Sequence, residues 1–294
     1  MNQSFELSRW LMLVSKHWSE NRKKYTLSLI AMAGLLLVWF VFALVMERAR
    51  PIDDNIQFVT YYFGLFLVGC LYASMLFADL SSKSKGMNYL AIPASHFEKL
   101  LCTLFYGVIA FFICYTLLFY LIDAPMVKLS NAIAYSHWQK THLAGSTFEA
   151  GRVLNVFTAI GDSDNHGDEF YHFLLAYFAL QSAFIFGSVY FPKFSFIKTV
   201  ISLLLISLFF VFFVGKVLNE MMPYGSFYKG ITSYRVFHVE AAASGSTIVT
   251  SNDITDKLVS LPSWIEDVLI FIAKYAFAPI FWTLAYYRLK EKEI

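Results

Sequence analysis

The run "LSLIAMAGLLLVWFVFALVM", residues 27–46, contains no charged side chain along its whole length. About 20 helical residues cross the roughly 30 Å of hydrocarbon in a bilayer, so this run predicts a membrane span. Five further apolar runs have comparable length: 57–78, 100–122, 170–191, 199–218 and 268–287. The sequence therefore predicts an all-α membrane protein with six transmembrane helices, forming a single membrane domain over residues 1–294.

The composition of the chain agrees with a lipid environment. Of 294 residues, 58% are hydrophobic and only 15% are charged, whereas soluble domains have about a quarter charged residues. The formal net charge of +2 gives no sign of a nucleic-acid partner. The lipid bilayer is thus the first partner that the sequence predicts.

Lysine and arginine are distributed unequally between the two predicted sides of the membrane. The N-terminal segment, residues 81–99, the 192–198 connection and the C-terminus are short and basic, with few acids. The longer segments 123–168 and 219–266 carry diluted basic residues together with many acids. Because basic residues favour the cytoplasm, we expect both termini and residues 81–99 there, and the two longer segments outside.

Residues 3–20 have the pattern of an amphipathic helix that precedes the first span. An apolar stripe at helical spacing includes Trp10, Val14 and Trp18, which suits a helix lying in the headgroup region. The alternative is a short helix packed on another subunit. Among the outer segments, "SYRVFHVE" (233–240) and "STIVTSNDIT" (246–255) alternate and are rich enough in β-branched residues to predict short strands.

The connection between the second and third spans, "SSKSKGMNYLAIPASHFEKLL" (81–101), contains several structural signals. Gly86 predicts a turn or a helix end, and Pro93 predicts a break. Ser95 and Glu98 have the spacing of a capping box, which would fix where the third span begins. We expect a basic strip and a short interfacial helix, suited either to docking a partner or simply to connecting two spans.

The same stretch resembles the cytoplasmic loop of type-2 ABC exporter permeases. In that family a glycine, a leucine, a Leu-Pro-x-Ser step and a lysine precede the third span. The matching residues here are Gly86, Leu90, Pro93, Ser95 and Lys99, with Ile92 in place of the family's leucine. The segment from Pro93 to Lys99 is also similar to a Pro-x-Ser-x-x-Glu-Lys signature of uncharacterised bacterial membrane proteins.

The resemblance implies a fold and a set of partners. It implies a permease in the bacterial cytoplasmic membrane, paired with a second permease subunit as a homodimer or heterodimer. A separate cytosolic ATPase subunit, which binds ATP and Mg²⁺, would dock on residues 81–99 as a coupling loop. The residues that we expect to serve in docking and coupling are Lys83, Lys85, Gly86, Tyr89, Leu90, Pro93, Ser95, Glu98 and Lys99.

The motifs of several enzyme classes are missing from the sequence. There is no G-x-x-x-x-G-K-S/T motif for binding nucleotide phosphates, no H-E-x-x-H zinc motif and no G-x-S-x-G nucleophile motif. We therefore expect no enzyme activity and no cofactor in this chain itself.

Two weaker candidates for chemistry remain. "GDSDNHGDEFYH" (161–172) half-resembles a calcium loop, with Asp162, Asp164, His166 and Asp168 as weak metal ligands. The favoured interpretation is that Asp168 caps the fourth span at its N-terminal end. Lys274 lies inside the sixth apolar run, where it either extends toward the membrane surface or lines a translocation path.

These features together predict the membrane-spanning permease subunit of an ABC-type exporter. The alternative is a non-transporting membrane scaffold or sensor whose outer segments bind a ligand or a protein.

Overall fold

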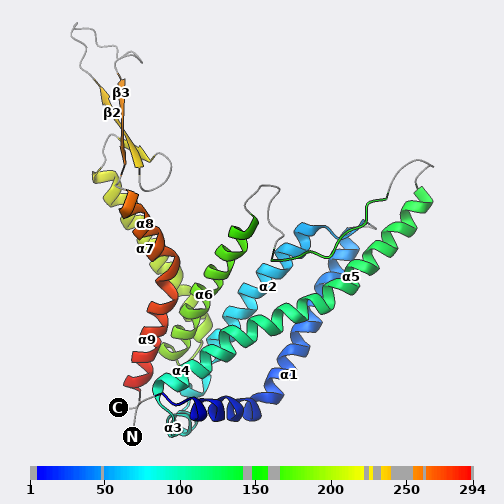
Figure 1. Ribbon diagram of the computed structural model, residues 1–294, viewed down its shortest axis with the longest axis horizontal. Helices are drawn as coiled ribbons and strands as arrows, with labels where there is room; N and C mark the ends of the chain where they lie inside the picture. Colours follow the sequence, from blue (N-terminus) through cyan, green and yellow to red (C-terminus); the bar gives the residue numbers. More distant parts are fainter. Residues whose placement is uncertain are drawn as a thin grey trace. The chain divides into compact units, whose positions relative to one another are not determined.

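The computed structural model describes residues 5–47, 50–141, 148–157, 166–221, 225–227, 233–239, 254–260 and 263–292. Helices dominate these residues (Figure 1). The chain divides into two compact units, and a single membrane domain stays a prediction. Unit 1 comprises Met1–Phe196 and Ala278–Ile294, and unit 2 comprises Ile197–Phe277.

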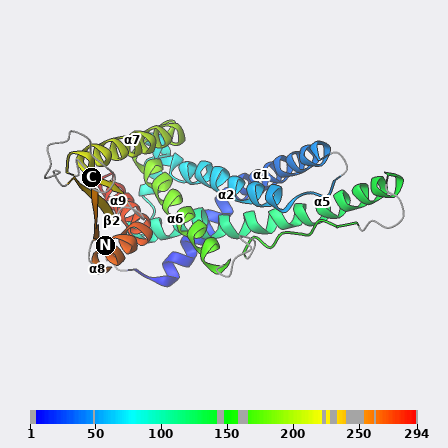
Figure 2. The same cartoon turned by 90° about the horizontal axis from the view of Figure 1, so that it is seen from above.

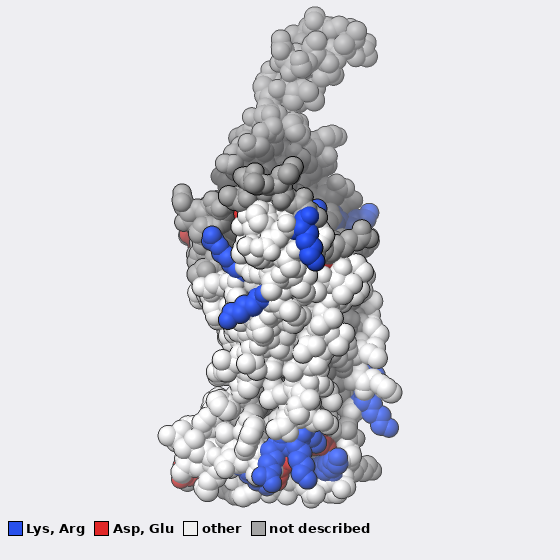
Figure 3. Space-filling view, turned by 90° about the vertical axis from the view of Figure 1, so that its right-hand side faces the viewer, with Lys and Arg blue, Asp and Glu red and all other residues white. Residues whose placement is uncertain are grey.

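Among the residues that the structure describes, five helices are long and apolar enough to cross a membrane. They are Leu7–Met46, Asp54–Leu80, His96–Lys140, Phe170–Tyr190 and Ser195–Phe213. Each contains one of the first five apolar runs seen in the sequence, either whole or for the most part. On the face shown in Figure 3, Lys and Arg gather near the lower end and reappear toward the top, with a belt between them that is almost uncharged. The membrane character that the sequence predicts is thus plain in the structure.

Unit 1 is a helical bundle in which α2 (Asp54–Met75) packs against α6 (His166–Tyr190) and α5 (Phe111–Thr141). Figure 2 shows α2 running alongside α5. Tyr61, Tyr115 and Tyr177 are almost fully buried between these helices. The Tyr61 hydroxyl lies 2.9 Å from that of Thr116, and Tyr115 donates to the Tyr61 carbonyl at 3.0 Å. Because buried hydroxyls need partners, these bonds hold an aromatic core in one arrangement.

The third long helix is continuous but changes its winding. It consists of α4 (His96–Leu104), a π-helical turn η2 (Phe105–Ala110) and α5. Gly107 lies in η2, and a Cβ at this position would collide with the Leu76 side chain. The wide turn and the missing side chain together let α2 approach closely.

The predicted interfacial helix and the first span form one helix, α1 (Leu7–Met46). Figure 1 shows its first turns crossing the base of unit 1 before the helix bends upward. Trp10 and Val14 pack against the cluster of Leu13, Cys102 and Tyr106. Part of the predicted apolar stripe therefore covers this chain's own α4 and η2, a third possibility beside lipid and another subunit.

The segment predicted as an outer loop, 123–168, is largely built into unit 1. α5 continues to Thr141, and residues 148–157, here called the strap, return along α2 and α5. The Gln57 amide donates to the Arg152 carbonyl and accepts from the Leu154 N–H, both at 2.9 Å. Asn131 makes the same kind of reciprocal pair with Gly151. Side-chain amides thus satisfy a strap backbone that has no strand partner.

The sixth apolar run, 268–287, is divided between two helices. α8 (Ser263–Tyr275) ends before Ala276, and α9 (Phe277–Glu291) begins after it. Pro279 lies in the first turn of α9, where its missing N–H is tolerated. A continuous helix would instead bring its ring against the carbonyl of Tyr275. A single sixth span therefore stays a prediction.

Unit 2 contains α7 (Ser195–Met221), from Ile197 onward, α8 and a small antiparallel sheet. Its strand order is β1 (Gly225–Phe227), β2 (Ser233–Val239) and β3 (Ile254–Ser260), and Ser233 pairs with Ser260. The strand predicted from "SYRVFHVE" is confirmed. Most of the second predicted strand, residues 246–253, lies outside the described residues, and β3 starts at its end. The sheet adds a β element to the predicted all-α fold.

Candidate functional site

Several elements of unit 1 meet at its lower end as drawn in Figure 1. They are the first turns of α1, the 3-10 turn η1 (Ala78–Ser81), α3 (Lys83–Leu90), the start of α4 and the end of α9. The His96 and Tyr286 rings are 6.5 Å apart, which connects α4 to α9. Nearby, burial and the charge of Arg288 lower the pKa of Lys292. This end contains the backbone of every residue that we expect from the sequence to serve in docking.

The capping box predicted at the start of the third long helix is confirmed. Ser95 has an extended backbone, and its hydroxyl accepts from the Glu98 N–H at 3.2 Å. The Glu98 carboxylate accepts from the Ser95 N–H at 2.8 Å. Two backbone donors that α4 leaves unsatisfied thereby find partners, which fixes the first residue of the helix.

Glu98 also binds the start of α1, which the sequence did not predict. Its Oε2 accepts from Arg9 Nε at 2.8 Å, and its Oε1 accepts from Arg9 Nη2 at 2.7 Å and from the Glu6 N–H at 2.9 Å. Glu98 is fully buried, whereas the Arg9 side chain is 27% exposed. We call Glu98 with Ser95, Arg9 and Glu6 the Glu98 joint.

The Glu98 joint is a two-pronged charge-assisted contact, which gives a defined angle as well as attraction. It joins residues about 90 positions apart in the sequence. No local pattern could have paired Arg9 with Glu98, because both charges are ordinary at a membrane surface. The only available signal was that a capping-box glutamate precedes a long buried helix.

Between η1 and α4, α3 presents an exposed face. Lys85 is exposed, with its Nζ 4.0 Å from Asp79, and Met87 is 66% exposed. Gly86 lies inside α3, where its N–H donates to the Ser82 carbonyl at 2.8 Å. The predicted turn at Gly86 is therefore wrong, since the helix includes the basic strip. Pro93 falls in the break after α3, as expected. The backbones of Lys83 and Leu90 lie in α3, but their side chains are outside the description.

Lys99 and Tyr89 face inward rather than toward a partner. Lys99 is 2% exposed, and its ammonium lies 5.9 Å from the centre of the Tyr89 ring. The Tyr89 ring also contacts Phe77 at 6.2 Å. Because a cation over an aromatic face is stabilised electrostatically when desolvated, the contact between Lys99 and Tyr89 stabilises the packing of α3 on α4. A docking or coupling role for Lys99 stays a prediction, and within this chain the residue is buried.

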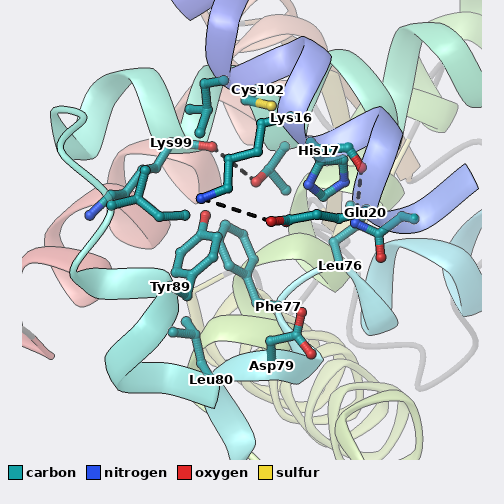
Figure 4. A pocket seen from close by; sticks show the side chains of 14 residues that line it. Lys16, His17, Glu20, Leu76, Phe77, Asp79, Leu80, Tyr89, Lys99 and Cys102 are labelled. Carbon is teal, nitrogen blue, oxygen red and sulfur yellow. Dashed lines mark hydrogen bonds and ion pairs between the residues drawn. The ribbon is translucent and has the colours of Figure 1, made fainter. Parts of the chain in front are cut away.

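A small cavity lies beside these residues (Figure 4). Lys16, His17 and Glu20 of α1 line one side, and Asp79 and Lys99 contribute from the other elements. Its volume of about 50 Å³ is far below the roughly 300 Å³ at which small-molecule pockets begin. The site is therefore a contact between helices that encloses only a small cavity.

The structure adds little evidence for the remaining candidate residues, those for a metal site and for a translocation path. Asp162 and Asp164 lie outside the described residues, and His166 and Asp168 fall in the first turn of α6 with undescribed side chains. Within the described part of the chain, no group of three or more potential ligands could hold a metal ion. Lys274 is exposed near the end of α8, and its place on a translocation path stays a prediction.

Comparisons of the chain with protein-family models, curated proteins and solved structures give no match. Any function must therefore be argued from the geometry of this site.

Proposed function

We propose that the chain is the membrane-spanning permease subunit of an ABC-type exporter, moved by a cytosolic ATPase that docks on residues 81–99. The observation that carries the proposal is the Glu98 joint, which fixes the loop below the membrane to two long helices at once. The likeness of residues 86–99 to exporter loops supplies the partner. ATP and Mg²⁺ would bind to that partner, and a second permease subunit would complete the path.

The joint suits this task because of what it connects. A push on the exposed face of α3 reaches α4 through the short 91–95 connection. From α4 it passes without a break along η2 and α5 to Thr141, and through Arg9 it passes to α1. Displacements of packed helices are a common form of conformational switching. The loop and both termini are then cytoplasmic, as the distribution of basic residues predicts.

A photo-crosslinking amino acid in place of Met87 tests the docking partner, because this side chain is 66% exposed on α3. Irradiation of living cells is expected to attach a polypeptide that contains a nucleotide-binding P-loop. The matched control is Leu121, 71% exposed on the apolar surface of α5, which should capture no such protein. Two results would contradict the proposal. One is that position 87 is accessible only to reagents outside the cell, and the other is that it captures a partner without a nucleotide site.

The second test concerns coupling. The double variant Ser95→Ala, Glu98→Ala should insert and bind the ATPase, but lose ATP-driven transport in reconstituted vesicles. Ser19→Ala with Glu20→Ala is the control, because it removes the same residue types from an exposed turn of α1 at the same end. Normal transport by the first double variant would show that the joint does not couple the two subunits.

A non-transporting scaffold or sensor is the second candidate, favoured by the ordered strap and by the antiparallel sheet of unit 2. The crosslink at Met87 separates the two functions. A signalling kinase or a protease on α3 favours the scaffold or sensor, and an ATPase favours the exporter.

A further inference from the structure

A groove opens between α1 and α2, with η2 and α5 as its floor. α1 contacts the bundle at two heights. Near the bend the Tyr25 ring lies 5.8 Å from Tyr106, and further along Phe40 lies 6.0 Å from Phe119. Between these contacts the groove has a volume of about 240 Å³. α1 is therefore held at both ends of an opening that faces outward from the bundle.

The walls of the groove are apolar and partly exposed. Met32 comes from α1, Leu71 and Met75 from α2, and Ala110 and Cys114 from the floor. Met75 is 67% exposed and Leu71 is 39% exposed, so the groove is open at its side. The volume exceeds the about 150 Å³ of a dry cavity that holds benzene. An empty space of this size would leave its lining without contacts, so an apolar occupant is favoured.

The mouth of the groove lies where aromatic and basic side chains meet. Trp18 and Tyr25 line it, and such residues are typical of the membrane–water interface. Arg22 lies four residues after Trp18 and three before Tyr25, so it shares their face of α1. Lys24 lies one turn before Ser28, which also lines the groove. Both basic side chains are exposed, and such cations attract phosphate groups.

We propose that this groove binds one acyl chain of an anionic phospholipid, with the lipid phosphate on Arg22. The charge-free runs that form the walls put the chain in hydrocarbon, and the basic mouth selects the headgroup. The bound lipid fills the gap between α1 and α2 without blocking either contact of α1. This site does not depend on the transport proposal, because the lipid need not be cargo.

The test uses the full chain reconstituted in vesicles that contain phosphatidylglycerol and phosphatidylcholine. Each lipid in turn carries a photoactivatable group on one acyl chain, and labelled peptides are mapped after irradiation. The phosphatidylglycerol probe is expected to label peptides containing Met32 and Met75 about tenfold more than the phosphatidylcholine probe. Both headgroups contain a phosphate, but the choline cation makes phosphatidylcholine zwitterionic and is repelled by Arg22 and Lys24, so only phosphatidylglycerol brings a net negative charge to the basic mouth; a tenfold preference corresponds to about 1.4 kcal/mol.

Two matched pairs of variants locate the site. Ser28→Phe fills the groove and should abolish the specific labelling, whereas Leu27→Phe, on an exposed position outside the groove, should leave it unchanged. Arg22→Gln should remove the preference for the anionic probe, and Lys23→Gln, on another face of the same turn, should keep it.

Three outcomes would overturn the proposal. Equal labelling by both probes in the wild-type protein would show that no headgroup is selected. Unchanged labelling in Ser28→Phe would place the lipid elsewhere. Crosslinks from a photoreactive residue at Ser28 to a second copy of the chain would make the groove a subunit interface.

Discussion

Two buried carboxylates on the same continuous helix, His96–Thr141, have opposite surroundings. Glu98 is 0% exposed and accepts four hydrogen bonds, from Arg9, Glu6 and Ser95. Asp123 is also 0% exposed, yet neither of its oxygens has a hydrogen-bond partner within the described residues. The buried carboxylate is therefore compensated at the start of this helix and not in its middle.

The difference shows that the two regions of unit 1 are stabilised by different kinds of hydrogen bond. A buried ionised group is costly unless it is paired and hydrogen-bonded, so Glu98 with all its donors acts as a fixed connection. Near Asp123 the strap is held by neutral groups instead: Gln57, Asn131 and the hydroxyls of Tyr62 and Tyr120. Substitutions at the two carboxylates should consequently change stability with opposite signs.

The largest expected effect is that of Glu98→Ala. It removes the acceptor of four donors and leaves Arg9 without its carboxylate, so a loss of about 3 kcal/mol in stability is expected. Thermal unfolding of the purified protein in detergent measures it. Glu20→Ala is the control, since Glu20 is exposed and only 3.8 Å from Lys16 in a helix-surface pair. Equal melting temperatures of Glu98→Ala and Glu20→Ala would show that the buried Glu98 contributes no more to stability than an exposed glutamate.

Gln57→Ala comes next and concerns the neutral hydrogen bonds of the strap. Gln57 is fully buried and makes two hydrogen bonds to the strap, each worth about 1 kcal/mol, so about 2 kcal/mol should be lost. Hydrogen exchange of residues 148–157 should accelerate selectively. Asn55→Ala is the control, because the exposed Asn55 side chain donates to Asp53 in its own turn. Unchanged exchange of the strap in Gln57→Ala would show that other contacts hold it.

The sequence predicted local features of this fold well and distant contacts poorly. Uncharged runs located the five long helices, and the spacing of Ser95 and Glu98 located the start of α4, because helix length and capping depend on neighbouring residues. The partner Arg9 could not be found this way, since it lies in another element. The burial of Lys99 could not be predicted for the same reason, because it depends on residues of other elements such as Tyr89 of α3.

The carboxylate of Asp123 was missed for a different reason. It directly follows the predicted span 100–122 and was assigned to an outer loop, although apolar residues continue at Met126 and Val127, both buried. If these apolar residues had been included, the predicted helix would have extended past residue 122 and Asp123 would have been recognised as an acid inside it.

Asp123→Leu should stabilise the protein by about 1 kcal/mol, because it replaces an unpartnered buried polar group with an apolar one of similar size. The melting temperature in detergent is expected to rise. Asp54→Leu supplies the control, since this acid lies in the first turn of α2 and its removal should lower stability slightly through the helix dipole. Destabilisation by Asp123→Leu as large as that of Glu98→Ala would mean that Asp123 has a partner or ligand in the membrane.

The smallest effect is expected for Lys85→Gln, at the same end as the Glu98 joint. Lys85 and Asp79 are 4.0 Å apart and both largely exposed, and such pairs contribute at most about 0.5 kcal/mol. Stability should therefore hardly change. If a partner docks on α3, however, the same variant should weaken that docking, which a pull-down of the ATPase at low and high salt would measure. Lys16→Gln, with its own exposed pair on α1, is the control. If Lys85→Gln lowered the melting temperature but left docking unchanged, Lys85 would be a structural residue like those of the Glu98 joint and not part of a docking face on α3.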